Sequence, residues 1–354
     1  MWTVIGQERA VAALGRALAG GRLSHAYLFS GPPQVGKYTT ALQFAQALNC
    51  RGEDPPCRRC RQCHLIEQGN HPDVELITVG GLCDESAHDH SSDNSRDIRI
   101  CQVRRLERVV SRTPFEGRYR VFIIDPADAL NVESSNAFLK TLEEPPPSLV
   151  LILVTSREES LLPTVVSRCR KVPFSLMTVT AVQAALEEEW SVPPEDAGLL
   201  ARLSGGRLGW AVTAWEDETV LPARAALLED GYRLTTVGRD ERFAYAAEMA
   251  GRFNRDREGV LRVLDLWRDW WRDVLLVASG CPGIVTNVDT LDRLGLLARK
   301  YTVGEIRHVL QAIAETRRSL LDNINAQLAL EVLMLDLGAP SIRKEKTSAA
   351  GPVA

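Results

Sequence analysis

Short apolar runs alternate with amphipathic stretches along the first half of the chain. The runs at 26–29, 121–124 and 149–154 have the length of buried strands, and weaker candidates lie at 74–79 and 171–174. After the first run, residues 39–48 place apolar side chains at helical spacing. Strands that alternate with helices in this way predict an α/β fold with a mostly parallel sheet and helices on both faces.

The pattern becomes helical after Phe174, and residues 179–190, 194–203 and 220–337 predict helices. Two apolar stripes follow a helical period in the last of these regions. The first contains Leu264, Trp267, Trp271 and Val274, and the second contains Leu321, Ile324, Leu328, Val332 and Leu335. Three tryptophans, 267, 270 and 271, lie beside arginines, as in proteins that stack on nucleic-acid bases. The helical period favours core or interface packing instead.

A glycine-rich loop lies between the first predicted strand and the first predicted helix. It has the G-x-x-x-x-G-K pattern, from Gly31 to Gly36 and Lys37. Such a loop surrounds phosphates with backbone N–H groups, its lysine reaches the terminal phosphates, and a following Ser or Thr holds magnesium. Here the following residue is Tyr38, whose hydroxyl is too far from the backbone for that role. The loop therefore predicts a phosphate-loop fold, while nucleotide binding stays open.

A second catalytic element of nucleotide hydrolases is also incomplete. Asp125 follows the apolar run 121–124, in the place of the carboxylate that supports magnesium. The next residue, where an acid would orient the attacking water, is Pro126. Asp128 is interpreted as a helix-start carboxylate rather than a replacement base. The pair Thr155-Ser156 ends a strand, where a phosphate-sensing residue could lie, although plain strand termination explains it as well.

Four of the eight cysteines form a cluster at 50–63, where C-x-x-C-x-x-C follows a single upstream cysteine. The residues are Cys50, Cys57, Cys60 and Cys63. Four thiolates at this spacing predict a closed, structural Zn²⁺ site, with free thiols or an iron–sulfur cluster as alternatives. Cys83, His88 and His90 suggest a second metal site, but the polar composition of 80–97 favours a surface loop.

Composition restricts the remaining classes. The 354 residues are 45% hydrophobic and 25% charged, which is ordinary for a globular protein of two or three domains. The net charge of −4 argues against nucleic-acid binding over the whole surface. Residues 1–21 lack a basic-then-apolar signal pattern, and the longest apolar run is too short to span a bilayer. We expect a cytoplasmic protein without membrane contact.

Several stretches together resemble bacterial clamp-loader subunits of the AAA+ class. They are Val-Ile-Gly-Gln at 4–7, Gly-Arg-Leu-Ser-His-Ala-Tyr-Leu-Phe at 21–29, the four-cysteine insert, Asn-Ala-Phe-Leu-Lys-Thr-Leu-Glu-Glu-Pro-Pro at 136–146 and Ser-Arg-Cys at 167–169. The resemblance implies an AAA+ phosphate-loop domain with a zinc insert (1–175), a small helical lid (176–219), an all-α collar domain for oligomerisation (220–340) and a disordered tail (341–354). It covers the first half closely and the rest in outline.

The departures at Tyr38 and Pro126 distinguish among these subunits, because ATPase motor subunits keep a Ser or Thr and an Asp-Glu pair there. The chain is therefore similar to the delta prime subunits of DNA polymerase III. The resemblance implies a subunit that does not hydrolyse ATP, in a heteropentamer with motor subunits and a delta subunit. Such a complex loads the sliding clamp on primed DNA. The resemblance also implies that Arg168 acts as an arginine finger in a neighbour's ATP site.

In motor subunits of this family a lid arginine touches the nucleotide, but here that position is Gly209, and Arg207 lies two residues early. Two other functions stay open. One is an active motor ATPase with unusual motifs. The other is a zinc-dependent DNA-binding module, supported by the arginines at 96, 99, 104, 105 and 108.

Overall fold

The computed structural model describes residues 2–83, 97–322 and 324–338. Within them the chain forms two compact units, one made of residues 1–197 and 206–212 and the other of 198–205 and the chain from 213 onward. Most of the loop predicted at 80–97, including His88 and His90, and the tail predicted at 341–354 lie outside the described residues.

The first unit contains a sheet of five parallel strands in the order β2-β3-β4-β1-β5. The strands are β1 (Ala26–Ser30), β2 (Val74–Ile77), β3 (Arg120–Ile124), β4 (Leu149–Thr155) and β5 (Arg170–Pro173). All five predicted strands are confirmed, with ends shifted by one or two residues. The central strands β3 and β4 are buried along their whole length, which explains why they read as continuous apolar runs.

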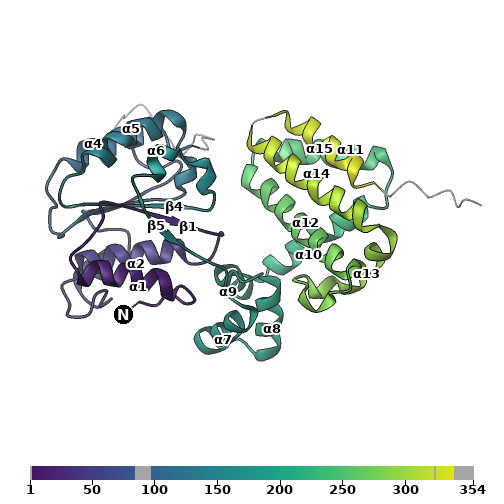
Figure 1. Cartoon of the computed structure of the whole chain (residues 1–354), viewed down its shortest axis with the longest axis horizontal. Coiled ribbons are helices and arrows are strands. Elements are labelled where there is room, and N and C mark those ends of the chain that lie inside the picture. Colours follow the sequence, from purple (N-terminus) through teal and green to yellow (C-terminus); the bar gives the residue numbers. More distant parts are fainter. Residues whose placement is uncertain (1, 84–96, 323, 339–354) are drawn as a thin grey trace, which may run out of the picture. The chain divides into compact units, whose positions relative to one another are not determined.

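Helices cover both faces of this sheet (Figure 1). One face carries α1 (Glu8–Ala19) and α2 (Lys37–Asn49), and the other carries α4 (Ile100–Val110), α5 (Val132–Glu143) and α6 (Pro163–Val166). Each face of the sheet has its own hydrophobic core. Since successive side chains of a strand point to opposite faces, Tyr27 and Phe29 of β1 pack in the core on the first face and Leu28 packs in the core on the second. The short α3 (Arg61–Glu67) belongs to the cysteine insert. The predicted α/β architecture is therefore confirmed.

Helices α7 (Val179–Trp190) and α8 (Pro194–Leu203) follow the sheet at the predicted positions, and α9 (Leu208–Glu216) comes after them. The boundaries 1–175, 176–219 and 220–340 remain predictions, because the two compact units divide within α8 and α9 rather than at those residues.

The second unit is helical, as predicted. It contains α10 (Val220–Leu234), α11 (Arg239–Phe253), α12 (Arg257–Ala278), α13 (Leu291–Lys300), α14 (Val303–Leu321) and α15 (Ala326–Asp336). Trp267, Trp270 and Trp271 are fully buried in its core, and Trp267 donates its indole N–H to the Leu227 carbonyl at 2.9 Å. These rings are core residues, so they are not a stacking surface for nucleic-acid bases.

The second predicted stripe has a different environment. Ile324, Leu328, Val332 and Leu335 are each about half exposed, while the opposite side of α15 packs inward through Leu330, Leu333 and Met334. Helix α15 is thus apolar on both sides, and the described residues of its own unit leave one side exposed. A search of the described residues found no helix that combines the length and the apolar character needed to cross a bilayer.

Candidate functional site

The glycine-rich loop connects β1 to α2, as the motif requires. Gly36 has φ of 91°, a left-handed conformation that favours glycine, and it directly precedes the first turn of α2. The neighbouring strands β4 and β3 bring Ser156 and Asp125 to the same edge of the sheet, because the carboxyl ends of parallel strands meet there. The expected nucleotide-site residues Gly31, Gly36, Lys37 and Asp125 therefore belong to one edge.

The lysine of this loop bonds to the protein itself. Lys37 Nζ donates to the carbonyl oxygen of Gly31 at 2.8 Å, to that of Pro32, and to Ser156 Oγ at 3.0 Å. The side chain is buried, and burial lowers the pKa of Lys37 to about 8, although the Asp125 and Asp128 carboxylates act in the opposite direction. A nucleotide phosphate would have to displace three acceptors that already satisfy the ammonium group.

The groups that would complete a magnesium site are replaced. Tyr38 is 41% exposed, and burial of part of its ring, together with the Asp125 carboxylate, raises the pKa of its hydroxyl. Burial also raises the pKa of Asp125, against the influence of Lys37. Asp128 accepts hydrogen bonds from Thr155 Oγ1 at 2.7 Å and Arg157 Nε at 2.8 Å. A carboxylate committed to two such partners is a poor candidate for a replacement base.

The first turn of α9 lies against the phosphate loop. The N–H of Gly209 donates to the carbonyl oxygen of Gln34 at 2.9 Å, and a Cβ at position 209 would lie only 2.8 Å from that oxygen. Gly209 is thus the residue of this helix that touches the loop. An arginine there, as in motor subunits, would not fit without a shift of the loop or the helix.

The four clustered cysteines converge as the spacing predicted. The Sγ atoms of Cys50, Cys57, Cys60 and Cys63 all lie within 4.8 Å of one another. Four sulfurs that share one tetrahedral Zn²⁺ at about 2.3 Å are roughly 3.8 Å apart, so the arrangement is compatible with a metal ion. Backbone N–H groups also point at the sulfurs, with Gly52 N and Cys57 N at 3.3 and 3.4 Å from Cys50 Sγ. This donor set can hold a metal ion.

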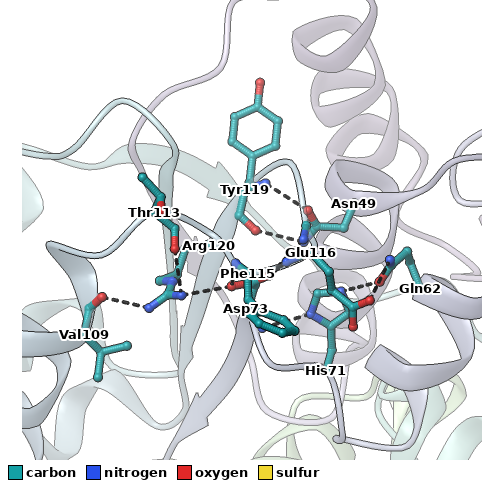
Figure 2. Close-up of polar contacts among 11 residues, drawn as sticks. Asn49, Gln62, His71, Asp73, Val109, Thr113, Phe115, Glu116, Tyr119 and Arg120 are labelled. Atoms are coloured by element: carbon teal, nitrogen blue, oxygen red, sulfur yellow. Dashed lines mark hydrogen bonds and ion pairs between the residues drawn. The ribbon is translucent and has the colours of Figure 1, made fainter.

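A buried polar network connects the cysteine insert to the amino ends of β2 and β3 (Figure 2). Its centre is the Asp73 carboxylate, which is fully buried. It accepts N–H donors from Phe115, Glu116 and Gly117 at 2.7 to 2.8 Å and from Arg120 Nη2 at 2.9 Å. Four donors on one carboxylate fix the loop before β3.

His71 and Gln62 extend the network into the insert. His71 Nδ1 accepts the N–H of Asp73 at 3.0 Å, and its Nε2 lies 2.6 Å from Oε1 of Gln62, which is located between Cys60 and Cys63. Because Nδ1 accepts, a neutral ring carries its proton on Nε2 and donates to Gln62. Burial lowers the pKa of His71, which keeps the ring neutral. On the insert side, Arg61 pairs with Glu116.

Replacing Asp73 with asparagine should strongly destabilise the first unit. The amide would present an NH₂ group to a site lined with donors, and it would leave Arg120, 9% exposed at its side chain, without its charge partner. Breaking a buried pair on one side typically costs about 3–5 kcal/mol. Chemical denaturation of Asp73→Asn is compared with that of Asp54→Asn, which makes the same change at an exposed carboxylate of the first unit.

The pH dependence provides a second measurement on the same variant. Burial alone would raise the pKa of Asp73, but the three N–H donors and Arg120 outweigh it and hold its pKa below the usual range. A carboxylate whose pKa is lower in the folded state than in the unfolded state stabilises the fold at any pH above its unfolded-state pKa. This stabilisation is lost as the pH falls through its folded-state pKa. Asp73→Asn should therefore flatten the loss of stability below about pH 4; an unchanged acid limb would contradict this role.

Arg168 lies in the turn after α6, on the first unit. Its Nη1 donates to the carbonyl oxygen of Thr164 at 2.9 Å, and its Nη2 lies 2.7 Å from Glu143 Oε1. The side chain is 36% exposed, whereas the neighbouring Cys169 is partly buried and burial raises the pKa of its thiol to about 12. The role of Arg168 as an arginine finger stays a prediction, and the sequence gave no signal for its partner Glu143.

Other contacts were also missed. The sequence leaves Ser156 open between strand termination and phosphate sensing, and it gives no sign that Ser156 Oγ accepts a hydrogen bond from Lys37. The Asp73 network had only one visible signal, a carboxylate immediately before a predicted strand.

Comparison with known proteins identifies the family. A family model described as DNA polymerase III, delta subunit, matches residues 6–178, and its C-terminal counterpart matches 245–338, together more than half of the chain. DNA polymerase III subunit delta prime of Bacillus subtilis is 29% identical over 332 residues, which are 94% of this chain and 96% of the relative. The chain belongs to the delta prime family of DNA polymerase III clamp-loader subunits.

Gamma/tau subunits are similar to part of this delta prime-family chain. The gamma/tau subunit of Mycobacterium tuberculosis is 36% identical over 211 residues, 57% of this chain and 34% of the relative. The chain thus spans about a third of that relative's length. Among solved structures, a gamma subunit-related protein of DNA polymerase III from Thermotoga maritima covers 92% of the chain and 98% of its own, at 17% identity and a TM-score of 0.40.

Proposed function

We propose that the chain is a subunit of a DNA polymerase III clamp loader that does not hydrolyse ATP itself and places Arg168 in the ATP site of a neighbouring subunit. The observation that carries the proposal is the contrast between two basic side chains. Lys37, the residue that would bind phosphate in the chain's own loop, is buried and bonded to Gly31, Pro32 and Ser156. Arg168 lies at a turn, and 36% of its side chain is exposed.

The chemistry of phosphoryl transfer supports the absence of hydrolysis. Such reactions need a metal held by a hydroxyl and a carboxylate, and a group that orients the attacking water. Tyr38 and Pro126 replace two of these groups, and Asp128 is bonded to Thr155 and Arg157. Residual nucleotide binding through Gly36 and Lys37 remains compatible with the proposal.

The purified chain should therefore show no ATP turnover above background. The measurement is phosphate release with magnesium present, for the wild type and for Lys37→Ala, which removes the ammonium group from the loop. The two proteins should give the same background rate. Magnesium-dependent turnover that disappears in Lys37→Ala would instead support the motor ATPase, the alternative favoured by the identity to gamma/tau subunits.

The proposed partners are motor subunits and a delta subunit in a heteropentamer, which together load a sliding clamp on primed DNA. The uncovered side of α15 supports an assembly role for the second unit. Leu328, Val332 and Leu335 are about half exposed along one side of the helix, and contiguous apolar surface of this kind marks protein contacts. Co-purification with the other loader subunits, followed by clamp loading on primed DNA, tests the function as a whole.

The cysteine cluster is proposed to hold structural Zn²⁺ rather than a catalytic metal, because four thiolates leave no coordination position open. A zinc-dependent DNA-binding module is the other alternative. Its support is α4, where Arg104 is exposed, although Arg105 forms an ion pair with Glu75. Salt-sensitive DNA binding by the chain alone would favour that alternative.

A further inference from the structure

Both terminal nitrogens of the Arg168 guanidinium group form hydrogen bonds within the chain. Nη1 donates to the main-chain carbonyl of Thr164 at 2.9 Å, and Nη2 contacts the Glu143 carboxylate at 2.7 Å. An arginine carries five N–H donors in a planar fork. Two of them are used by these partners, and the part of the chain that the structure describes shows no hydrogen bond from the other three. The two contacts therefore fix the plane of the fork without using all of its donors.

Both partners of Arg168 come from helices that are anchored in the same core. Glu143 is the last residue of α5, where Phe138 and Leu142 are buried against the sheet. Thr164 lies in α6, where Val165 is buried in that core. Because α5 and α6 pack on one another, the backbones that carry the carboxylate and the carbonyl are fixed in one core, and the two contacts restrict a side chain that would otherwise sample several rotamers.

We infer that Glu143 is a positioning residue for Arg168 in phosphoryl transfer at the neighbour's site. The inference rests on the proposed function of Arg168. An arginine finger stabilises charge that develops in the transition state, and this effect depends on pre-orientation of its donors. Glu143 supplies that orientation through a charge-assisted hydrogen bond. It does not touch the substrate, so its loss should lower the rate of chemistry rather than the affinity for ATP.

The exposure of the pair makes the inference testable. The side chains of Arg168 and Glu143 are 36% and 52% exposed, and ion pairs at such positions contribute little to folding. Glu143→Ala should therefore keep the melting temperature of the subunit and its assembly into the complex. A fall in activity then reports the orientation of Arg168. The matched control is Glu144→Ala, because Glu144 is the adjacent exposed carboxylate, and no ion pair to it occurs among the described residues.

The experiment measures steady-state ATP hydrolysis and the pre-steady-state burst by the reconstituted complex with clamp and primed DNA. We expect Glu143→Ala to lower the rate at the affected site by about ten- to a hundred-fold, the size of effect that follows from a small misplacement of a catalytic group. KM for ATP should not change. Glu143→Gln, which keeps an acceptor oxygen at the same distance, should restore most of the rate. Glu144→Ala should match the wild type.

A double variant separates this inference from the proposal on which it rests. If Glu143 acts through Arg168, adding Glu143→Ala to Arg168→Ala should slow the complex no further. The inference alone is overturned if Arg168→Ala is slow but Glu143→Ala has the wild-type rate, or if Glu143→Ala has the same effect with and without Arg168. A wild-type rate for Arg168→Ala overturns the arginine finger and, with it, the role of Glu143.

Discussion

Replacing Arg168 with alanine should abolish hydrolysis at one ATP site of the assembled loader while leaving the subunit folded. Arginine fingers in related phosphoryl-transfer systems contribute on the order of a thousand-fold or more to the rate. The side chain is only partly buried, and its contacts are one carbonyl and one exposed carboxylate, so its removal should change the stability of the chain by less than about 1 kcal/mol. The effect should appear only in the complex.

The readout is clamp loading on primed DNA, together with ATP hydrolysis, by complexes that carry Arg168→Ala, Arg168→Lys or Arg170→Ala. Lysine keeps the charge but lacks the planar fork of donors, so Arg168→Lys should stay slow. Arg170, an exposed arginine two residues further along, is the matched control and should tolerate alanine. Wild-type hydrolysis and loading by Arg168→Ala would leave the subunit with an architectural role alone.

The strands and helices could be predicted because their patterns are local. A run such as 121–124 is apolar at every position, since β3 is covered on both faces, and it can be recognised without any knowledge of its neighbours. The phosphate loop and the cysteine cluster are also local, because their function depends on short spacings. The four Sγ atoms of the cluster converge, and Gly36 of the phosphate loop has the positive φ that favours glycine, as expected.

The contacts that define the state of the site could not be predicted, because they join residues far apart in sequence. Lys37 and Ser156, which share a hydrogen bond, are separated by 119 positions. The N–H of Gly209 in α9 donates to the carbonyl oxygen of Gln34, far earlier in the sequence. No periodicity links such pairs. The stripe on α15 illustrates another limit: Leu328 and Leu330 are equally apolar, yet one is 58% exposed and the other is buried. Hydrophobic character predicts that a side will be covered, but not whether this chain or a partner covers it.

Removing one ligand from the cysteine cluster should release the metal and loosen the insert. We expect about one zinc per wild-type chain by elemental analysis, and much less in Cys60→Ser, because a closed tetrahedral site needs all four thiolates. Structural zinc is worth on the order of 10 kcal/mol in small zinc modules. That free energy adds to the contacts that hold the insert on the sheet, among them the hydrogen bond from Gln46 Nε2 to the Cys63 carbonyl at 2.9 Å and the burial of Ile66.

Loss of the metal should destabilise the segments that contact the insert more than the main sheet. Gln62 and Arg61, which lie beside the cysteines, contact His71 and Glu116, so hydrogen exchange should rise in α3 and in the loop at 113–119. The main sheet should remain protected, because residues of its strands and of the helices outside the insert make up most of its two cores, to which α3 adds Ile66. Cys281→Ser, which removes an exposed thiol outside the cluster, is the control. A native chain that is well folded without metal would refute the zinc site, and bound iron would replace it with a cluster.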